Sequence, residues 1–163
     1  MAKIFISLGS NIEPERHLKA ALTDLNDYFD ALELSSVFES EAVGFEGTNF
    51  LNMVVAAQTE LPIAEVVSTF KQIEQNHGRV KGAKKFAPRT LDLDLLLYDD
   101  TVTTQPIELP RAEILYNAFV LWPLAEIAPS LIHPVVQQSY QALWDNYDKS
   151  QQSLWPVEFS WSK

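Results

Sequence analysis

The segment from residue 87 to residue 100 (APRTLDLDLLLYDD) constrains the fold more strongly than any other stretch of the sequence. Leucine alternates with aspartate in its middle, and two consecutive aspartates at its end favour a turn. This pattern predicts a β-strand from Thr90 to Tyr98. Because successive side chains of a strand point to opposite faces, we expect Asp92 and Asp94 on one face and the intervening leucines on the other.

The carboxylates of Asp92 and Asp94 would lie about 7 Å apart along such a strand and would need cations as partners. Hard oxygen ligands on a rigid element suit Mg²⁺, which usually takes one or two carboxylates and completes its coordination with water and substrate phosphate. A solvent-facing edge strand would explain the same pattern. The Asp-x-Asp pair alone therefore leaves both interpretations open.

Composition and charge narrow the classes of function. The 163 residues suffice for one domain, which we expect to span residues 1–163, and the absence of cysteine excludes a disulfide framework and a thiolate metal site. The formal net charge of -10 argues against nucleic-acid or anionic-membrane binding. The first predicted strand leaves no room for a signal peptide, and no apolar run approaches membrane-spanning length. We expect a cytoplasmic protein and a monomer.

A basic cluster stands out against this acidic background. Positions 79–89 hold five of the twelve lysines and arginines and no acidic residue: Arg79, Lys81, Lys84, Lys85 and Arg89. Such a cluster is typical of a site for a small, highly charged anion, although a solvated loop would have the same composition. Because the cluster leads directly into the strand of Asp92 and Asp94, the sequence favours phosphate bound beside a cation.

The remaining periodicity predicts an α+β fold. Apolar residues alternate in some segments and recur at helical spacing in others, with Gly78 in the position of a helix C-cap. The predicted order is strand, helix, strand, strand, helix, strand, at residues 3–8, 14–29, 34–41, 50–59, 62–77 and 90–98. This is the ferredoxin-like order, an antiparallel sheet with helices on one face. Helices predicted at 119–127 and 140–147 would cover the other face, after a short hairpin arm at 101–109.

Asn52 is a polar residue within an otherwise apolar strand face. A buried amide without partners costs about 1–3 kcal/mol per unsatisfied group, so Asn52 either bonds the backbone or binds a ligand. Beside Phe50 and Phe45, it would suit a flat heteroaromatic ring with donor and acceptor edges. Glu74 lies in a last helical turn, where the helix dipole mildly disfavours a carboxylate. A structural role remains open for both polar residues.

Five motifs in this order resemble those of the 6-hydroxymethyl-7,8-dihydropterin pyrophosphokinase family, which acts in folate biosynthesis. The resemblance runs from Ile4 to about Pro129, and its most specific string is PRTLDLD. The motifs are LGSN at 8–11, FLN at 50–52, ExxxGR at 74–79, PRTLDLD at 88–94 and FVLWPLAEIAP at 119–129. The resemblance implies an ATP-dependent diphosphotransferase that moves a pyrophosphoryl group from ATP, the co-substrate, to a pterin alcohol.

The resemblance also implies roles for the charged residues. Asp92 and Asp94 would hold two Mg²⁺ ions that bridge the ATP phosphates and the pterin hydroxymethyl group. Arg79 and Arg89 would bind or steer the phosphates. Such a reaction depends mostly on positioning and charge neutralisation, which metal ions and arginines supply.

On the pterin side, the resemblance assigns Asn52 and the loop around Ser40, Val43 and Gly44 to the edge of the pterin ring. Phe50 and Phe119 would enclose the ring from its two sides. Glu74 and Asn11 are assigned to the same substrate site by the motifs that contain them.

The sequence departs from the family pattern on the ATP side. Arg111 follows Leu109-Pro110 where the family usually has histidine, and Asn117 precedes the phenylalanine motif where the family usually has arginine. Phe86 replaces a loop aromatic that is often tryptophan, and Lys81 replaces an arginine. We expect Lys81, Phe86, Arg89 and Arg111 to form the ATP side, with Arg111 in place of the lost cation.

Two alternatives remain. The changes at Arg111 and Asn117 are also compatible with a pterin-binding paralogue whose kinase activity is weak or lost. A nucleotidyltransferase would combine a Gly-Ser pair with an Asp-x-Asp strand as well. In those enzymes one helix separates the two motifs, whereas here Ser10 and Asp92 are 82 positions apart (92 − 10 = 82).

Overall fold

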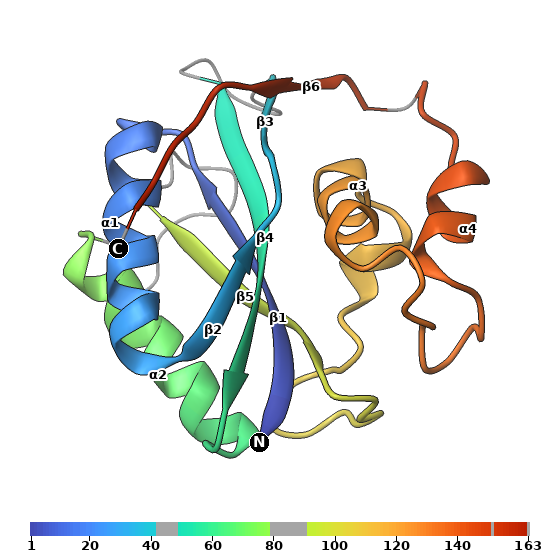
Figure 1. Cartoon of the computed structure of the whole chain (residues 1–163), viewed down its shortest axis with the longest axis horizontal. Helices are drawn as coiled ribbons and strands as arrows, with labels where there is room; N and C mark the ends of the chain where they lie inside the picture. Colours follow the sequence, from blue (N-terminus) through green and yellow to red (C-terminus); the bar gives the residue numbers. More distant parts are fainter. Residues whose placement is uncertain (42–48, 79–90, 151, 163) are drawn as a thin grey trace.

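The structure, a computed structural model, describes residues 1–41, 49–78, 91–150 and 152–162 (Figure 1). The described residues form a six-stranded antiparallel sheet with the order β5-β1-β4-β3-β6, and β2 also pairs with β4. The strands are β1 (Ala2–Ser10), β2 (Asp30–Leu34), β3 (Val37–Ser40), β4 (Phe50–Thr59), β5 (Asp92–Tyr98) and β6 (Leu154–Val157). The helices are α1 (Pro14–Tyr28), α2 (Ile63–Asn76), α3 (Ala118–Ile127) and α4 (Tyr140–Asp145), and a short 3-10 helix spans Ala112–Leu115.

This arrangement confirms the predicted α+β class and the ferredoxin-like order of strands and helices. Helices α1 and α2 cover one face of the sheet, and α3 and α4 lie on the other (Figure 1). We call these the α1/α2 face and the α3/α4 face. β4 has the predicted bounds. The four predicted helices and the strands β1 and β5 differ from their predicted bounds by one or two residues at their ends.

A continuous hydrophobic core lies on the α1/α2 face. The even-numbered residues of β1 point to it, because side chains alternate along the strand. On α1 the apolar residues recur every three or four positions and form one stripe against the sheet. The fully buried members of this core include Ile4, Ile6, Leu8, Leu18, Leu22, Leu25, Met53, Val55 and Ile73.

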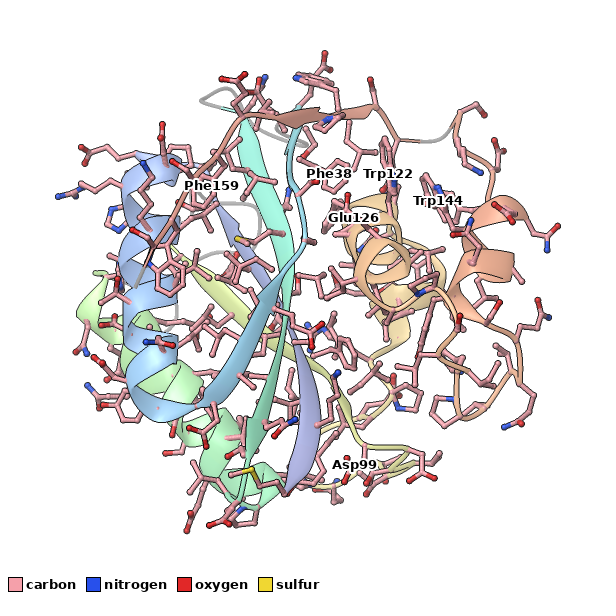
Figure 2. All side chains as sticks on the ribbon, viewed as in Figure 1. Phe38, Asp99, Trp122, Glu126, Trp144 and Phe159 are labelled. Atoms are coloured by element: carbon pink, nitrogen blue, oxygen red, sulfur yellow. The ribbon has the colours of Figure 1, made fainter. Side chains whose placement is uncertain are left out.

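A second core lies on the α3/α4 face. β5 contributes two consecutive leucines, Leu96 and Leu97, because a register shift against β1 between Phe5 and Ile6 leaves one additional residue in β5. α3 lies between the sheet and α4 and is apolar nearly all round. Figure 2 shows Phe38, Trp122 and Trp144 on β3, α3 and α4, where the rings of Trp122 and Trp144 stack at 5.1 Å.

The prediction of one continuous strand at 34–41 is wrong. The chain forms β2 and β3 instead, separated by Ser35 and Ser36. The backbone N–H and the hydroxyl of Ser36 both donate to the carboxylate of Glu126, the hydroxyl at 2.8 Å. Because Glu126 belongs to α3 (Figure 2), a partner 90 positions away interrupts this strand.

β6 is a strand that the periodicity does not predict. It pairs antiparallel with β3, and Pro156 lies opposite Phe38 in the register. The predicted hairpin arm is confirmed by a two-hydrogen-bond bridge between Thr103 and Leu109, at 3.0 and 2.9 Å. None of the helices in the described part of the chain is long and apolar enough to cross a membrane.

Candidate functional site

Asp92 and Asp94 lie on the α3/α4 face of β5, as the alternation predicts. Leu91, Leu93 and Leu95 are buried in the opposite core. In the register, Asp92 lies opposite Gly9 and Asp94 opposite Ser7 of β1. Both aspartates are only partly buried, so their carboxylates can meet a ligand from the solvent side.

Glu74 holds the backbone between the two aspartates. It lies in the last turns of α2 and is 9% exposed, and its Oε2 accepts a hydrogen bond of 2.8 Å from the N–H of Leu93. Among the described strands β5 lies at the edge of the sheet, so no other described strand pairs with its outward N–H groups. The Glu74 carboxylate therefore fixes the strand at the point from which Asp92 and Asp94 project.

Asn52 is buried on the same face, two strands from the aspartates. Its Nδ2 donates to the hydroxyl of Ser40 at 3.3 Å, and it lies opposite Gly9 across the pairing of β1 with β4. A Cβ on Gly9 would come within 2.7 Å of Asn52 Oδ1, so a larger residue at position 9 would displace the amide from its observed place. β1 continues through Gly9 and Ser10, two residues beyond its predicted end.

Among the described residues, Arg111 is a cation that lies beside Asp94. Its Nη2 lies 3.5 Å from Asp94 Oδ1, and its Nε and Nη2 donate to Glu113 Oε1 at 3.0 and 2.8 Å. Burial lowers the pKa of Arg111, but the carboxylates of Asp94 and Glu113 more than offset this and leave the pKa above its usual value. The guanidinium is therefore a permanent positive charge at the site.

The aromatic pair assigned to the pterin comes from two elements that pack together. Phe50 begins β4 and shares the α3/α4 face with Asn52, and Phe119 lies in the first turn of α3, which packs on β4. Asn11 is buried just beyond the end of β1. The described members of the predicted pterin set thus belong to neighbouring parts of one face and its strand ends, except Glu74, which reaches the edge of β5 from α2 on the other face.

Six predicted site residues lie outside the described residues. They are Val43 and Gly44 of the pterin set and Arg79, Lys81, Phe86 and Arg89 of the phosphate set. Their roles stay predictions.

The donors present fit Mg²⁺. Asp92 and Asp94 supply hard carboxylate oxygens from one face of a rigid strand, as Mg²⁺ requires. Within the described ranges, no group of three or more histidine, cysteine, aspartate or glutamate residues could hold a metal. A metal at this strand would therefore complete its coordination with water and substrate oxygens, which is the usual manner of Mg²⁺.

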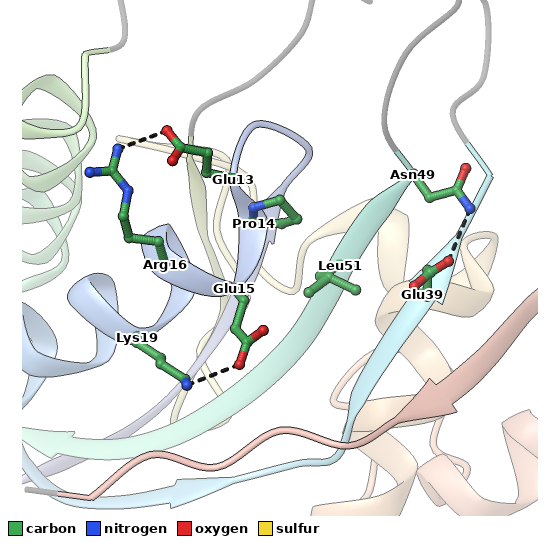
Figure 3. A pocket seen from close by; sticks show the side chains of 8 residues that line it. All are labelled: Glu13, Pro14, Glu15, Arg16, Lys19, Glu39, Asn49 and Leu51. Atoms are coloured by element: carbon green, nitrogen blue, oxygen red, sulfur yellow. Dashed lines mark hydrogen bonds and ion pairs between the residues drawn. The ribbon is translucent and has the colours of Figure 1, made fainter.

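A surface pocket elsewhere does not coincide with this site. It is lined from the N-terminal part of α1 and from the ends of β3 and β4 (Figure 3), and Leu51 in its lining packs against the α1/α2 core. Four of its charged side chains form exposed pairs, Glu13 with Arg16 and Glu15 with Lys19, each at 3.0 Å, and Glu39 accepts a hydrogen bond from Asn49 at 3.0 Å. Such pairs contribute little energy, and nothing in this lining indicates chemistry.

Sequence reasoning missed two residues of the site. Ser7 is 8% exposed and lies between Val54 and Asp94 in the sheet, and the alternation of β1 could have placed it there. The sequence does not predict a role for Glu113. It lies two positions from its partner Arg111, in a segment without the helical or strand periodicity that would place the two side chains on one face.

Comparisons with known proteins point to one family. A model of the family described as 7,8-dihydro-6-hydroxymethylpterin-pyrophosphokinase matches residues 5–129. A 2-amino-4-hydroxy-6-hydroxymethyldihydropteridine pyrophosphokinase of Aquifex aeolicus is 36% identical over 141 residues, which cover 85% of this chain and 88% of the relative. A protein of the same name from Bacillus subtilis is 37% identical over 128 residues, which cover 76% of each chain.

Solved structures agree on the fold. A Plasmodium falciparum HPPK-DHPS with SDX-DHP superposes with a TM-score of 0.71 at 12% identity, and the match covers 90% of this chain and 44% of that one. The same protein with pteroate gives a TM-score of 0.72 at 13% identity, with coverage of 90% and 42%. This chain spans less than half the length of those solved chains.

Proposed function

The chain belongs to the 7,8-dihydro-6-hydroxymethylpterin-pyrophosphokinase family, whose members are diphosphotransferases of folate biosynthesis, and from this premise we propose that it transfers a pyrophosphoryl group from ATP to 6-hydroxymethyl-7,8-dihydropterin. The observation that carries the proposal is the shared face of β5, β1 and β4. On it, the carboxylates of Asp92 and Asp94 and the amide of Asn52 lie on either side of β1, with Arg111 beside Asp94.

Asp92 and Asp94 would hold two Mg²⁺ ions, which when bound neutralise phosphate charge and orient the transferred group. The residues of the chain do the rest. Glu74 keeps the two carboxylates in place through the N–H of Leu93. Arg111 presents a permanent positive charge to the phosphates, and Arg79, Arg89, Lys81 and Phe86 would complete the ATP side.

The pterin would lie over the Asn52 end of the face. Asn52 has an amide with donors and an acceptor, and Ser40 orients it through their hydrogen bond. Phe50 and Phe119 would enclose the ring, and Ser40, Val43, Gly44, Asn11 and Glu74 would complete the pterin side. Transfer to the hydroxymethyl oxygen then releases AMP, because the α-phosphate stays with the adenosine.

We further propose that residues 1–163 act as one domain, as a monomer and in the cytoplasm. The two cores share one sheet, so neither layer of helices has a core independent of the other. The acidic net charge of -10 favours small-molecule substrates over nucleic acid or anionic membranes.

The test is the identity of the products with Mg-ATP and 6-hydroxymethyl-7,8-dihydropterin. We expect AMP and the pterin pyrophosphate in equal amounts, separated by ion-pair chromatography. Release of ADP, or of pyrophosphate with transfer of AMP, would contradict the proposal. Absence of turnover together with tight pterin binding would favour the paralogue without kinase activity.

A pair of asparagine variants tests the pterin side. Asn52→Ala should weaken pterin binding about tenfold, which corresponds to about 1.4 kcal/mol, and should leave binding of a non-hydrolysable ATP analogue unchanged. The matched control is Asn49→Ala, because Asn49 bonds Glu39 at the pocket of the α1/α2 face. Equal effects of the two variants in calorimetry would contradict the assignment of Asn52.

A further inference from the structure

Arg111 is held at both its ends. Its backbone N–H donates to the carbonyl of Leu96 at 3.0 Å, which ties it to β5 two residues beyond Asp94. Its guanidinium donates twice to Glu113 Oε1, at 3.0 and 2.8 Å, and approaches Asp94 Oδ1 at 3.5 Å. One nitrogen, Nη2, therefore faces two carboxylates and lies closer to that of Glu113.

Glu113 itself has little freedom to move. Its second oxygen, Oε2, accepts a hydrogen bond of 2.9 Å from Asn117 Nδ2. The side-chain oxygen of Asn117 accepts from Gln152 Nε2 at 3.1 Å, and Gln152 Oε1 accepts from the N–H of Ala118 at 2.7 Å. The chain of bonds fixes the Glu113 carboxylate to the first turn of α3 and, through it, fixes how far Arg111 leans toward Asp94.

We propose that Glu113 is a positioning residue that holds the guanidinium of Arg111 off Asp94, and so preserves the affinity of Asp94 for a divalent cation. The inference rests on the proposed metal site of Asp92 and Asp94. A guanidinium in direct contact with a carboxylate competes with a metal ion for the same oxygens. In its observed place, Arg111 makes a 3.5 Å ion pair with Asp94, longer than its bonds of 3.0 and 2.8 Å to Glu113, and can meet an anionic group bound there.

The proposal predicts opposite effects of two substitutions. Glu113→Gln removes the charge that attracts Arg111, so Arg111 moves onto Asp94 and cation affinity falls about five- to tenfold. Arg111→Gln removes the competitor, so cation affinity rises. In the double variant there is no Arg111 guanidinium that could move onto Asp94 when Glu113 is replaced. Its cation affinity should therefore equal that of Arg111→Gln alone.

A charge-conserving variant separates position from charge. Glu113→Asp keeps the carboxylate and withdraws it by one methylene, so it should also weaken cation binding if the position of Arg111 matters. If instead the negative charge of Glu113 acted on the cation through space, the cation affinity of Glu113→Asp would stay near that of the wild type. Asp100→Asn, an exposed change in the turn that follows β5, controls for the loss of one acidic charge.

The measurement is the dissociation constant of Mn²⁺ alone, from water-proton relaxation, for each variant and for Asp94→Asn, with thermal midpoints to verify folding. We expect Arg111→Gln and the double variant to bind Mn²⁺ more tightly than the wild type. We expect Glu113→Asp and Glu113→Gln to bind Mn²⁺ less tightly than the wild type. If Glu113→Gln bound Mn²⁺ as tightly as the wild type, the role of Glu113 would be overturned. The same would follow if Glu113→Gln lowered Mn²⁺ affinity as much in the Arg111→Gln background as it does alone. Either result would leave the metal site intact. Wild-type affinity in Asp94→Asn would overturn the metal site itself, and with it this inference.

Discussion

The two faces of the sheet are built from the same strands but differ in what they contain. The α1/α2 face is mostly apolar, with leucine, isoleucine, methionine and valine side chains packed against α1 and α2, and its buried polar residues Ser10, Thr59 and Glu74 lie at the ends of β1, β4 and α2. The α3/α4 face is apolar only where α3 covers it, and its remaining part contains Ser7, Asn52, Asp92 and Asp94. Because side chains alternate along a strand, one β5 strand can take part in the core and in the chemistry at once.

This difference teaches that stability and activity should separate by face. From Asp92 to Leu95, adjacent residues of β5 point to opposite sides, so replacing one should change the free energy of unfolding and replacing the next should change turnover. The four predictions below test this separation, from the largest expected effect to the smallest.

The largest effect on turnover is expected on the α3/α4 face. Asp94→Asn should lower turnover at least about 1,000-fold, or about 4 kcal/mol, because the amide loses the charge that binds a divalent cation. The variant should keep its thermal midpoint, since Asp94 is not part of either core. Single-turnover rates at saturating Mg-ATP measure this, and a rate near that of the wild type would refute the metal assignment.

One position further along β5, the expected effect changes in kind. Leu95→Ala should lower the free energy of unfolding by about 3 kcal/mol, through lost burial and a residual cavity in the α1/α2 core. Turnover per folded molecule should stay near the wild-type value. Urea titration gives the free energy, with Val102→Ala, which is 60% exposed, as the control. A loss of turnover without loss of stability would break the separation of the two faces.

Glu74 should be the exception, because it reaches the edge of β5 from α2 and serves both faces. Glu74→Ala leaves the buried N–H of Leu93 without its acceptor and should cost about 1–3 kcal/mol of stability. It should also lower turnover, because Asp92 and Asp94 lose their fixed spacing. Glu74→Gln retains an acceptor oxygen and should recover most of the stability in the same urea titration. Full turnover in Glu74→Ala would limit Glu74 to a structural role.

The smallest effect is expected in a chain of hydrogen bonds between α1 and the end of α2. His17 Nδ1 and His77 Nδ1 are 2.8 Å apart, Arg16 Nη2 lies 3.3 Å from His17 Nε2, and His77 Nε2 lies 3.2 Å from Asp24 Oδ2. Because Arg16 can only donate, this geometry has His17 Nε2 accept from Arg16, which leaves the N–H of His17 on Nδ1, where it donates to His77. A proton added to His17 Nε2 removes the acceptor for Arg16 and breaks that bond.

Acidification should therefore weaken this contact. Burial, then the neighbouring His77 and Arg16, lower the pKa of His17 below 6.5 in the folded protein. The unfolded chain then binds more protons, so the stability from neutral His17 is present above pH 6.5 and is lost as the pH falls through the folded-state pKa. We expect a loss of about 1 kcal/mol, the net value of one hydrogen bond.

The measurement is the unfolding free energy at pH 7.5 and pH 5.0 for the wild type and His17→Asn. The pH dependence should be smaller in His17→Asn. Burial also lowers the pKa of His133, which is present in both proteins, so its contribution cancels in the difference. An identical pH dependence of the two proteins would show that His17 is not part of the effect.

Much of the site was predictable because alternation is a local property. The strand pattern of 90–98 placed Asp92 and Asp94 on one face, and the same reasoning placed Asn52 opposite Met53 and Val55. β6 was not predictable, because four residues with an internal proline become a strand only beside β3. The break between β2 and β3 likewise depends on Glu126, a residue of α3.

The sequence by itself determined which side chains share a face, since the two-residue period of a strand and the 3.6-residue period of a helix act within one segment. The tertiary structure alone decided which segments meet: Glu74 at the edge of β5, Gly9 under the amide of Asn52, and Arg111 between Glu113 and Asp94. These contacts join residues by folding geometry rather than by periodicity. A charge or a hydrogen-bond donor acquires its role only when the fold brings its partner within bonding distance.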